Sequence, residues 1–408
     1  MRASTFAAPV LMAALVALLP LPAGAQAPAA SPPAAAAPAD GEKKPPTLRD
    51  EIRLFSYLEA SYTWNVRGAG RGGVNELRVY DYDEGFTFNM AELSIKKDPS
   101  EAYPFGFGLV LTAGMDAQKN HSLGIFRDDN DAFPFRNTPG FDIQEAYVGI
   151  RIPVGGGLNV RAGKWVSLLG YEVIESPSNL NVSRGYLFNF AGPFTNTGVV
   201  ATYFAADWLT VQAGITTGSD VTEDNNDSPT VGAGFQLTPL EGLAITLGTL
   251  VGPEQNNNDR NQRWILDLVA TYTGIARTTL AAEITGGREK REASLAALGT
   301  RRDTDASWWG WGVWAAYDWT ERFRTAIRQE YFKDADGART GFGGKLSLWS
   351  TTLTLQYKIW RGLVGRLEYR HDQADERVFR NRYDSAHTLA PTSRAMDTIS
   401  LSAYYLFF

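Results

Sequence analysis

Two segments carry charged residues at alternate positions, and these residues are the ones best suited to act on a solute. Alternate side chains of an extended strand point to the same side, so each segment would present a row of charge on one face. Guanidinium groups attract anions and carboxylates attract cations, so such rows could select or orient charged solutes. The arginines of the two rows are Arg322, Arg324, Arg328, Arg366 and Arg370, and the carboxylates among them are Glu330, Glu368 and Asp372.

A third group of polar side chains lies in residues 167–197. Its candidates are Tyr171, Glu172, Glu175 and Arg184. If these carboxylates faced the arginine rows, the opposed charges would create a transverse field that orients polar solutes and disfavours apolar ones. The simpler alternative is that all of these charges are solvated and paired with local neighbours.

Enzymatic chemistry has little support in the sequence. A hydrolase needs a base, usually His, beside a nucleophile or an activating carboxylate. The chain has only three His, and His371 directly precedes Asp372, so in a strand their side chains would point to opposite sides. The motifs G-x-S-x-G and H-E-x-x-H and the phosphate loop do not occur. We therefore expect no enzymatic activity and no cofactor.

Acidic and amide side chains also gather in two short segments, which raises the question of a metal site. They are Asp220, Glu223, Asp224 and Asp227, and residues 256–259. Such oxygen donors suit a hard cation such as Ca²⁺, but their spacing does not match the EF-hand pattern. The chain has no Cys, which excludes thiolate ligands and disulfides. We expect these segments to be solvated loops without a bound metal.

The elements that position these residues alternate between apolar and polar with period two, which is typical of strands. In four stretches the apolar face begins and ends with an aromatic residue, eight positions apart. Eight residues span roughly 26 Å of strand, or about 20 Å along the normal of a membrane that the strand crosses at about 40°. This separation predicts the two aromatic girdles of a membrane barrel. The pairs are Trp264 and Tyr272, Trp309 and Tyr317, Phe323 and Tyr331, and Trp349 and Tyr357.

The segments between these strands alternate between short and long, as in outer-membrane barrels with short periplasmic turns and long outer loops. Eight long segments, among them residues 167–197 and 252–262, imply about 16 strands, with 14 or 18 as alternatives. The sequence thus predicts an all-β fold, a transmembrane antiparallel β-barrel. A barrel of this size is too wide for side chains to fill, so we expect a water-filled channel.

The N-terminus predicts export from the cytoplasm. Residues 1–25 combine a basic start, a short apolar run and an Ala-Gly-Ala cleavage site, which indicates a signal peptide. Residues 26–50 are rich in Ala and Pro and predict an extended periplasmic linker, which leaves residues 51–408 for the barrel. The expected location is the bacterial outer membrane. A net charge of −6 argues against nucleic acid as a partner.

Two segments within residues 85–205 point to a family. They contain Ala91-Glu92-Leu93-Ser94-Ile95-Lys96-Lys97-Asp98-Pro99, Gly163-Lys164-Trp165, Gly170-Tyr171-Glu172, Ser176-Pro177-Ser178-Asn179-Leu180-Asn181, Ser183-Arg184-Gly185-Tyr186 and Pro193-Phe194-Thr195-Asn196-Thr197-Gly198. This chain resembles the β-barrel porins described as OmpL-like. A resemblance to the anion-selective porins is the alternative interpretation. The resemblance implies an outer-membrane channel without catalytic residues. The terminal Phe408 resembles the signal that the barrel-assembly machinery recognises.

The function that we expect is passive diffusion of small polar solutes or ions through a porin that an inward-folded third loop, residues 167–197, constricts. The partners would be those solutes or ions, outer-membrane lipid and lipopolysaccharide, the barrel-assembly machinery, and two further copies in a homotrimer. The alternatives are a structural or adhesive barrel without an open pore and an outer-membrane hydrolase. The sequence leaves the preference for anions or cations open.

Overall fold

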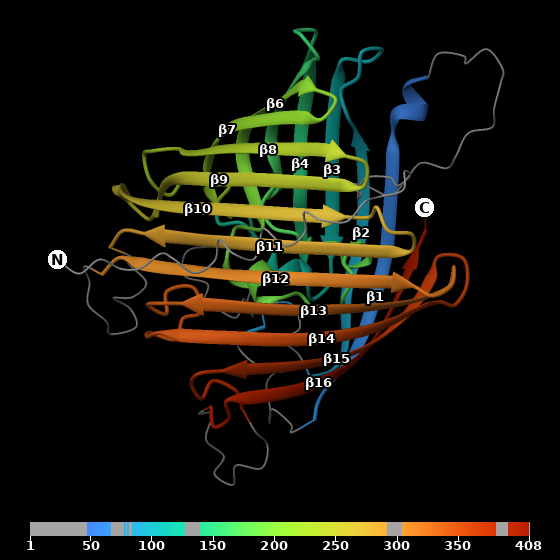
Figure 1. Ribbon diagram of the computed structural model, residues 1–408. Helices are drawn as coiled ribbons and strands as arrows, with labels where there is room; N and C mark the ends of the chain where they lie inside the picture. Colours follow the sequence, from blue (N-terminus) through green and yellow to red (C-terminus); the bar gives the residue numbers. More distant parts are fainter. Residues whose placement is uncertain are drawn as a thin grey trace.

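The computed structural model describes residues 47–66, 77–78, 80, 84–126, 139–291, 304–380 and 391–407. In these residues sixteen strands form one closed antiparallel barrel, as predicted (Figure 1). Each strand pairs with its neighbours in the sequence, and β1 (Arg53–Asn65) pairs with β16 (Ala395–Leu406) to close the barrel. A closed barrel leaves no strand edge unpaired, which is the condition for crossing a bilayer with strands.

The other strands follow in sequence order. They are β2 (Gly85–Lys97), β3 (Phe105–Ala113), β4 (Phe141–Ile152), β5 (Leu158–Val166), β6 (Thr195–Ala206), β7 (Leu209–Ser219), β8 (Thr230–Leu240), β9 (Leu243–Gln255), β10 (Asn258–Tyr272), β11 (Thr278–Glu289), β12 (Ala306–Asp318), β13 (Phe323–Asp334), β14 (Leu346–Lys358) and β15 (Leu363–Ala374). Short helices lie outside the strands: η1 (Leu48–Glu51), η2 (Ala117–Lys119), η3 (Ser176–Ser178) and α1 (Tyr186–Phe190). Within the described residues, no helix has both the length and the apolar character needed to cross a membrane.

The two faces of the barrel wall follow the period-two pattern. In β12 the outward Trp309 and Val313 are each 45% exposed, whereas the inward Trp308 and Trp314 are each 2% exposed. The eight aromatic residues predicted for the girdles all lie in β10, β12, β13 and β14, on the outward face. Neighbouring members are in register, because Tyr331 pairs with Trp349 and Phe323 pairs with Tyr357. Their role as membrane girdles stays a prediction.

One connection differs from its prediction. Residues 252–262 were expected to form a long outer loop, but β9 and β10 continue through this segment and meet in a two-residue turn at 256–257. Asn257 adopts a φ of 55°, a left-handed conformation that Asn tolerates well. The polar side chains that suggested a loop bond within the hairpin instead, since the Asn258 side-chain oxygen accepts from the backbone of Arg260 and Asn261.

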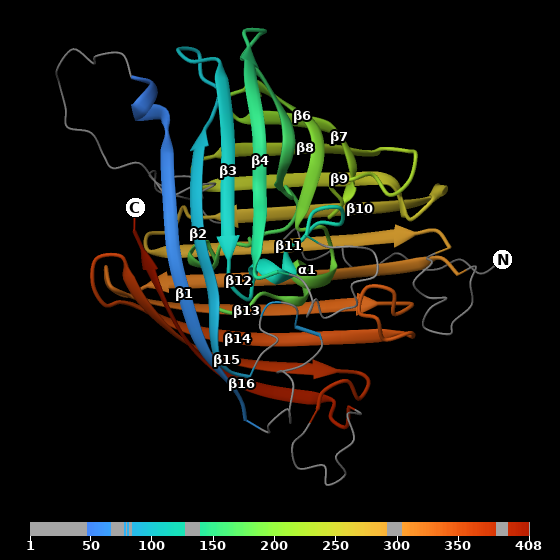
Figure 2. The same ribbon diagram turned by 180° about the vertical axis from the view of Figure 1, so that it is seen from behind.

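The third long connection, between β5 and β6, lies inside the barrel, where α1 is seen behind the strands (Figure 2). Its apolar residues Leu180, Tyr186, Leu187 and Phe190 pack with the inward Trp308, Trp314 and Phe332 in one buried cluster. Helix α1 comes so close to β12 that a Cβ atom on Gly310 would lie 2.4 Å from Leu187. The main buried apolar cluster is therefore made by this loop and the wall from β10 to β16.

Candidate functional site

The structure places four of the five predicted wall arginines on the inward face. Arg328 on β13 and Arg366 and Arg370 on β15 are buried, and Arg324 on β13 is half-buried. Arg322 is different, because it lies in the turn between β12 and β13 and is exposed. Its even spacing with Arg324 suggested a shared face, but the strand begins only at Phe323.

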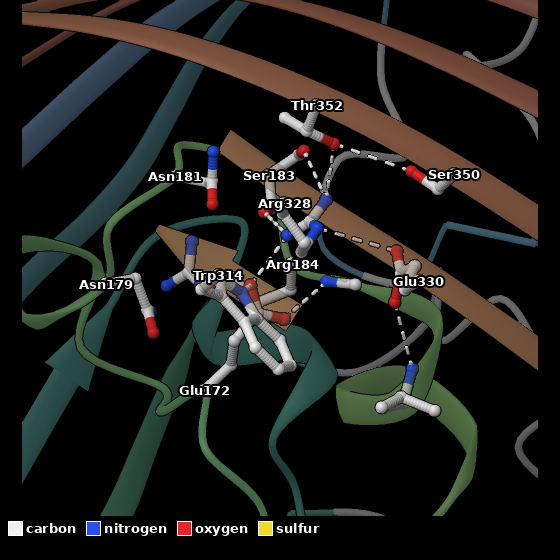
Figure 3. Close-up of polar contacts among 12 residues, drawn as sticks. Glu172, Asn179, Asn181, Ser183, Arg184, Trp314, Arg328, Glu330, Ser350 and Thr352 are labelled. Atoms are coloured by element: carbon white, nitrogen blue, oxygen red, sulfur yellow. Dashed lines mark hydrogen bonds and ion pairs between the residues drawn. The ribbon is translucent and has the colours of Figure 1, made fainter. Parts of the chain in front are cut away.

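Arg328 and Glu172 bring the wall and the loop together. The Arg328 guanidinium lies 2.6 Å from the Glu172 carboxylate, and both side chains are almost completely buried. Arg328 also donates to the backbone oxygen of Ser183 in the loop and, at 3.0 Å, to the hydroxyl of Thr352 on β14 (Figure 3). Trp314 reaches the same carboxylate at 3.5 Å. The pair is thus one contact within a network that joins the loop to three strands.

Arg366 and Arg370 also hold the loop backbone. Arg366 donates to the Ser176 carbonyl at 3.1 Å and lies 2.6 Å from Glu59 on β1. Arg370 donates to the Arg184 carbonyl at 2.7 Å and to Asp372 at 2.9 Å. Each arginine therefore has a wall carboxylate for its charge and also donates to a carbonyl of the loop.

Wall carboxylates bind the backbone amides of the same loop. Glu368 accepts from Val182 at 2.6 Å and from Ser183 at 2.9 Å, and Glu330 accepts from Tyr186 at 2.7 Å. An irregular loop leaves such N–H groups unpaired, and a buried unpaired N–H is costly. The loop is therefore held by the wall at both its donors and its acceptors.

Two further wall carboxylates, Asp267 on β10 and Glu283 on β11, were not among the predicted site residues. Asp267 accepts from the backbone of Gly170, and Glu283 accepts from the backbone of Tyr171, each at 2.9 Å. The sequence did contain a signal, because Asp267 stands on the polar face of an alternating strand. Alternation shows which side a residue faces, but it does not show that a loop will reach it.

The side chains of the remaining predicted loop residues have their described contacts away from the arginine rows. The Tyr171 ring packs against Trp314, with 4.7 Å between the ring centroids. Glu175 accepts from Gln144 on β4 at 2.9 Å, and burial raises the pKa of its carboxyl although Lys96 opposes this shift. Arg184 donates to carbonyls of its own loop, Val182 and Ile174. Of the four predicted loop residues, Glu172 alone meets a predicted wall arginine through its side chain.

The first long connection contributes to the same interior. Arg78 lies 2.6 Å from Asp372, and the ring of Tyr80 packs against Phe188 and Phe194 at centroid distances of 5.2 Å and 5.7 Å. Asp220, which was considered as a metal ligand, accepts from the backbone of Phe194 and Thr195. Among the described residues, no group of three or more His, Cys, Asp or Glu side chains is arranged to hold a metal ion. Phe408 and residues 1–46 lie outside the described part of the chain.

Solved structures of outer-membrane channels share this fold. The outer-membrane channel DcaP of Acinetobacter baumannii matches with a TM-score of 0.56 and 12% identity, over 87% of this chain and 97% of that one. An anion-selective porin from Comamonas acidovorans matches with a TM-score of 0.56 and 10% identity, over 87% and 99%. The trimer form of Vibrio cholerae OmpT matches with a TM-score of 0.52 and 12% identity, over 87% and 99%. At these identities the likeness shows the fold alone.

The comparison of sequences identifies a family, whereas the comparison of structures shows only the fold. No curated protein matches the chain. The family described as "Putative beta-barrel porin-2, OmpL-like" matches residues 51–407, which include all sixteen strands of the barrel. Together with the closed sixteen-strand barrel, this match supports a protein of the outer membrane. The chain therefore belongs to the OmpL-like β-barrel porin-2 family.

Proposed function

We propose that the protein is a passive channel for small polar solutes or ions, and that its third loop, residues 167–197, narrows the passage. The observation that carries this proposal is the attachment of the loop to the inner wall of a sixteen-strand barrel. A loop bound in this way reduces the width of the lumen while the rest of the wall stays free of it. The proposed role is transport without chemical change, so no residue is assigned a catalytic task.

The wall of β7 and β8 supports a passage on the side away from the arginines. The inward residues there are small or uncharged: Gln212 and Gly214 on β7, and Gly232, Gly234 and Gln236 on β8. All of them are at least partly exposed. Small inward side chains leave room for water next to the loop, and amides can replace part of the hydration of a polar solute.

The contact distances bear on the transverse field considered above. Glu172 is 2.6 Å from Arg328, so these two charges neutralise each other instead of facing each other across water. Glu59 and Asp372 do the same for Arg366 and Arg370. This pairing favours the simpler alternative, in which the arginines fix the loop and contribute little field to the passage.

The proposed setting of the channel includes several partners. Residues 1–25 are removed on export, residues 26–50 link the barrel to the periplasm, and Phe408 serves the barrel-assembly machinery. Outward aromatic residues such as Trp264, which is 56% exposed, contact lipid and lipopolysaccharide. The proposed assembly is a homotrimer, a form named for the Vibrio cholerae OmpT structure. Native mass spectrometry of the detergent-extracted protein tests this, and a purely monomeric spectrum would contradict it.

The test of the channel is single-channel recording of the refolded mature protein in a planar bilayer. Steady, open conductance steps are the expected result. Silence from protein that has been shown to be folded and inserted would contradict the proposal, and it would favour a structural barrel whose lumen is closed by its first and third loops.

A further inference from the structure

A small cavity lies between the third loop and the wall of β10 and β11. It has a volume of about 90 Å³ and is bordered by the acidic Glu172, Asp267 and Glu283, by the hydroxyl-bearing Thr285, and otherwise by uncharged residues of β5 and the loop. No Lys, Arg or His of the described chain lines it. The cavity is thus acidic in an interior where most other charges are paired.

Two of the three carboxylates have no basic partner. Glu172 is neutralised by Arg328, but Asp267 and Glu283 form no ion pair with a Lys, Arg or His in the described residues. They are 2% and 5% exposed, they accept from the backbone N–H groups of Gly170 and Tyr171, and the Asp267 carboxyl also contacts the side chains of Glu283 and Thr285. The second oxygen of Asp267, Oδ1, is buried without any hydrogen-bond partner in the described part of the chain.

Asp267 and Glu283 are also close to each other on the wall. Asp267 on β10 stands opposite Thr285 on β11, and Glu283 stands opposite Val269. The two residues are therefore diagonal neighbours on one inward face, a spacing of roughly 7–8 Å that long side chains can bridge. They also bind consecutive backbone amides, which brings both carboxylates to the same short stretch of the loop.

We propose that Asp267 and Glu283 form a subsite for a monovalent cationic group, an alkali ion or a small primary ammonium, and that this subsite makes the channel prefer cations. The inference rests on the proposed channel function. Burying carboxylates without a countercharge is costly, so the pair gains free energy when a cation enters. A cavity of about 90 Å³ holds only a few water-sized groups, so it fits a partly hydrated ion and not a bulky solute.

The primary test is the reversal potential of the full-length mature protein in a planar bilayer under a potassium chloride gradient. The wild type should favour K⁺ over Cl⁻, and the double variant Asp267→Asn, Glu283→Gln should lower the permeability ratio several-fold toward one. Both amides still accept from Gly170 and Tyr171, so the loop should stay in place. A wild type without cation preference, or a double variant with an unchanged ratio, would overturn the proposal.

The matched control is Glu289→Gln. Glu289 lies on the same strand and the same inward face as Glu283, but Arg263 pairs with it at 2.7 Å and also lies 3.6 Å from Glu254. The loss of an already neutralised charge should change the permeability ratio much less than the double variant does. An equal change in the control would mean that overall charge, and not the subsite, sets the selectivity, and it would refute the proposal.

A second measurement separates the subsite from the channel. Crystals of the wild-type protein soaked in thallium(I) should show anomalous density between Asp267 and Glu283, and crystals of the double variant should not. Open conductance without this density would support the channel and refute the subsite. That result is expected if the two carboxyls share a proton instead of binding a cation. Density in a protein that does not conduct means that the cation site stands and the channel function fails.

Discussion

Arg328 and Glu172 show what charged residues do inside this barrel. Each is almost fully buried, and the 2.6 Å contact between them removes two charges from the passage while it fixes the loop to β13. Asp267 and Glu283 contrast with this pair, because their donors are backbone amides. In the proposed subsite, the charge offered to a cation comes from these two carboxylates and not from the arginines.

The variant Glu172→Gln should loosen the third loop. Removal of one partner of a buried ion pair typically costs about 3–5 kcal/mol, because the other charge stays buried. Arg328 also lies 3.5 Å from Glu330, so we expect the lower end of this range. Single-channel recordings should show higher and noisier conductance, and proteolysis within residues 167–194 should become faster.

Asp318→Asn is the matched control for this variant. Asp318 pairs with Arg324 at 2.8 Å, but neither residue has a hydrogen bond to the loop among the described contacts. Its conductance should therefore stay as quiet as that of the wild type. Unchanged noise in Glu172→Gln would show that the pair does not hold the loop.

Glu175 should make the loop sensitive to pH. Burial raises the pKa of this carboxyl above its ordinary value of 4.5, so the folded loop binds a proton that the unfolded chain has released. The sign follows from linkage: the loop is most stable below that ordinary value and loses stability as the pH rises through the raised pKa. Current noise should therefore increase with pH above 4.5, and Glu175→Gln should abolish this dependence. Equal dependence in both proteins would contradict the assignment.

At the scale of elements, Gly310 on strand β12 lets the third loop pack closely against the wall. A Cβ atom on Gly310 would lie 2.4 Å from the end of the Leu187 side chain and 2.5 Å from the backbone oxygen of Tyr331 on β13, so a side chain at this inward position would force its neighbours to move. The outward positions of the same strand carry Trp309 and Val313, which have no such neighbour and are exposed. The same strand is therefore tightly constrained on one face and open on the other.

The variant Gly310→Val should displace α1 from the wall. Overpacking of this kind commonly costs about 1–3 kcal/mol, here by forcing the Leu187 side chain and the Tyr331 carbonyl of β13 to move. Limited proteolysis of the folded barrel should become faster within the loop. Ala315→Val, on the outward face of the same strand, is the control and should be cleaved like the wild type. Equal cleavage of all three proteins would show that α1 does not depend on this contact.

The outward face of β14 should behave as a membrane surface. Leu353 is 46% exposed and lies midway between the aromatic residues Trp349 and Tyr357. Leu353→Lys should cost about 2–4 kcal/mol, the amount expected for a basic residue at the middle of a bilayer. Denaturant unfolding from lipid vesicles measures this, and Leu353→Ala separates the charge from the lost side-chain contacts. A loss no greater for Lys than for Ala would place Leu353 outside the hydrocarbon.

At the scale of the whole molecule, the inner wall of the closed barrel differs from one side to the other. Arg78 of the first connection and the third loop bind the wall between β10 and β15, whereas the wall of β7 and β8 carries small inward residues. This asymmetry supports the proposed passage along the wall of β7 and β8. The Asp267 and Glu283 pair lies at the loop's edge.

The signal-peptide prediction can be tested at the N-terminus of the exported protein. We expect the protein purified from outer membranes to begin at Gln26, because the Ala23-Gly24-Ala25 site precedes it. Intact mass spectrometry reads this directly, as the loss of residues 1–25. A mass that still includes these residues would mean that the segment is kept as an anchor.

The sequence by itself indicated the barrel, a strand number near sixteen with 14 or 18 as alternatives, and the inward or outward face of residues such as Arg328 and Trp309. These properties follow from a period of two, from the alternation of short and long connections, and from the aromatic spacing of four stretches, all of which are local patterns. The length of the β9–β10 connection could not be read in this way, because Asn and Asp suit a loop and a tight hairpin equally well. Only the tertiary structure decided which charges are paired, since Glu172 meets Arg328 across 156 positions of sequence and Gly170 meets Asp267 across 97. Pairing depends on where an irregular loop lies inside the lumen, and no periodic pattern records that position.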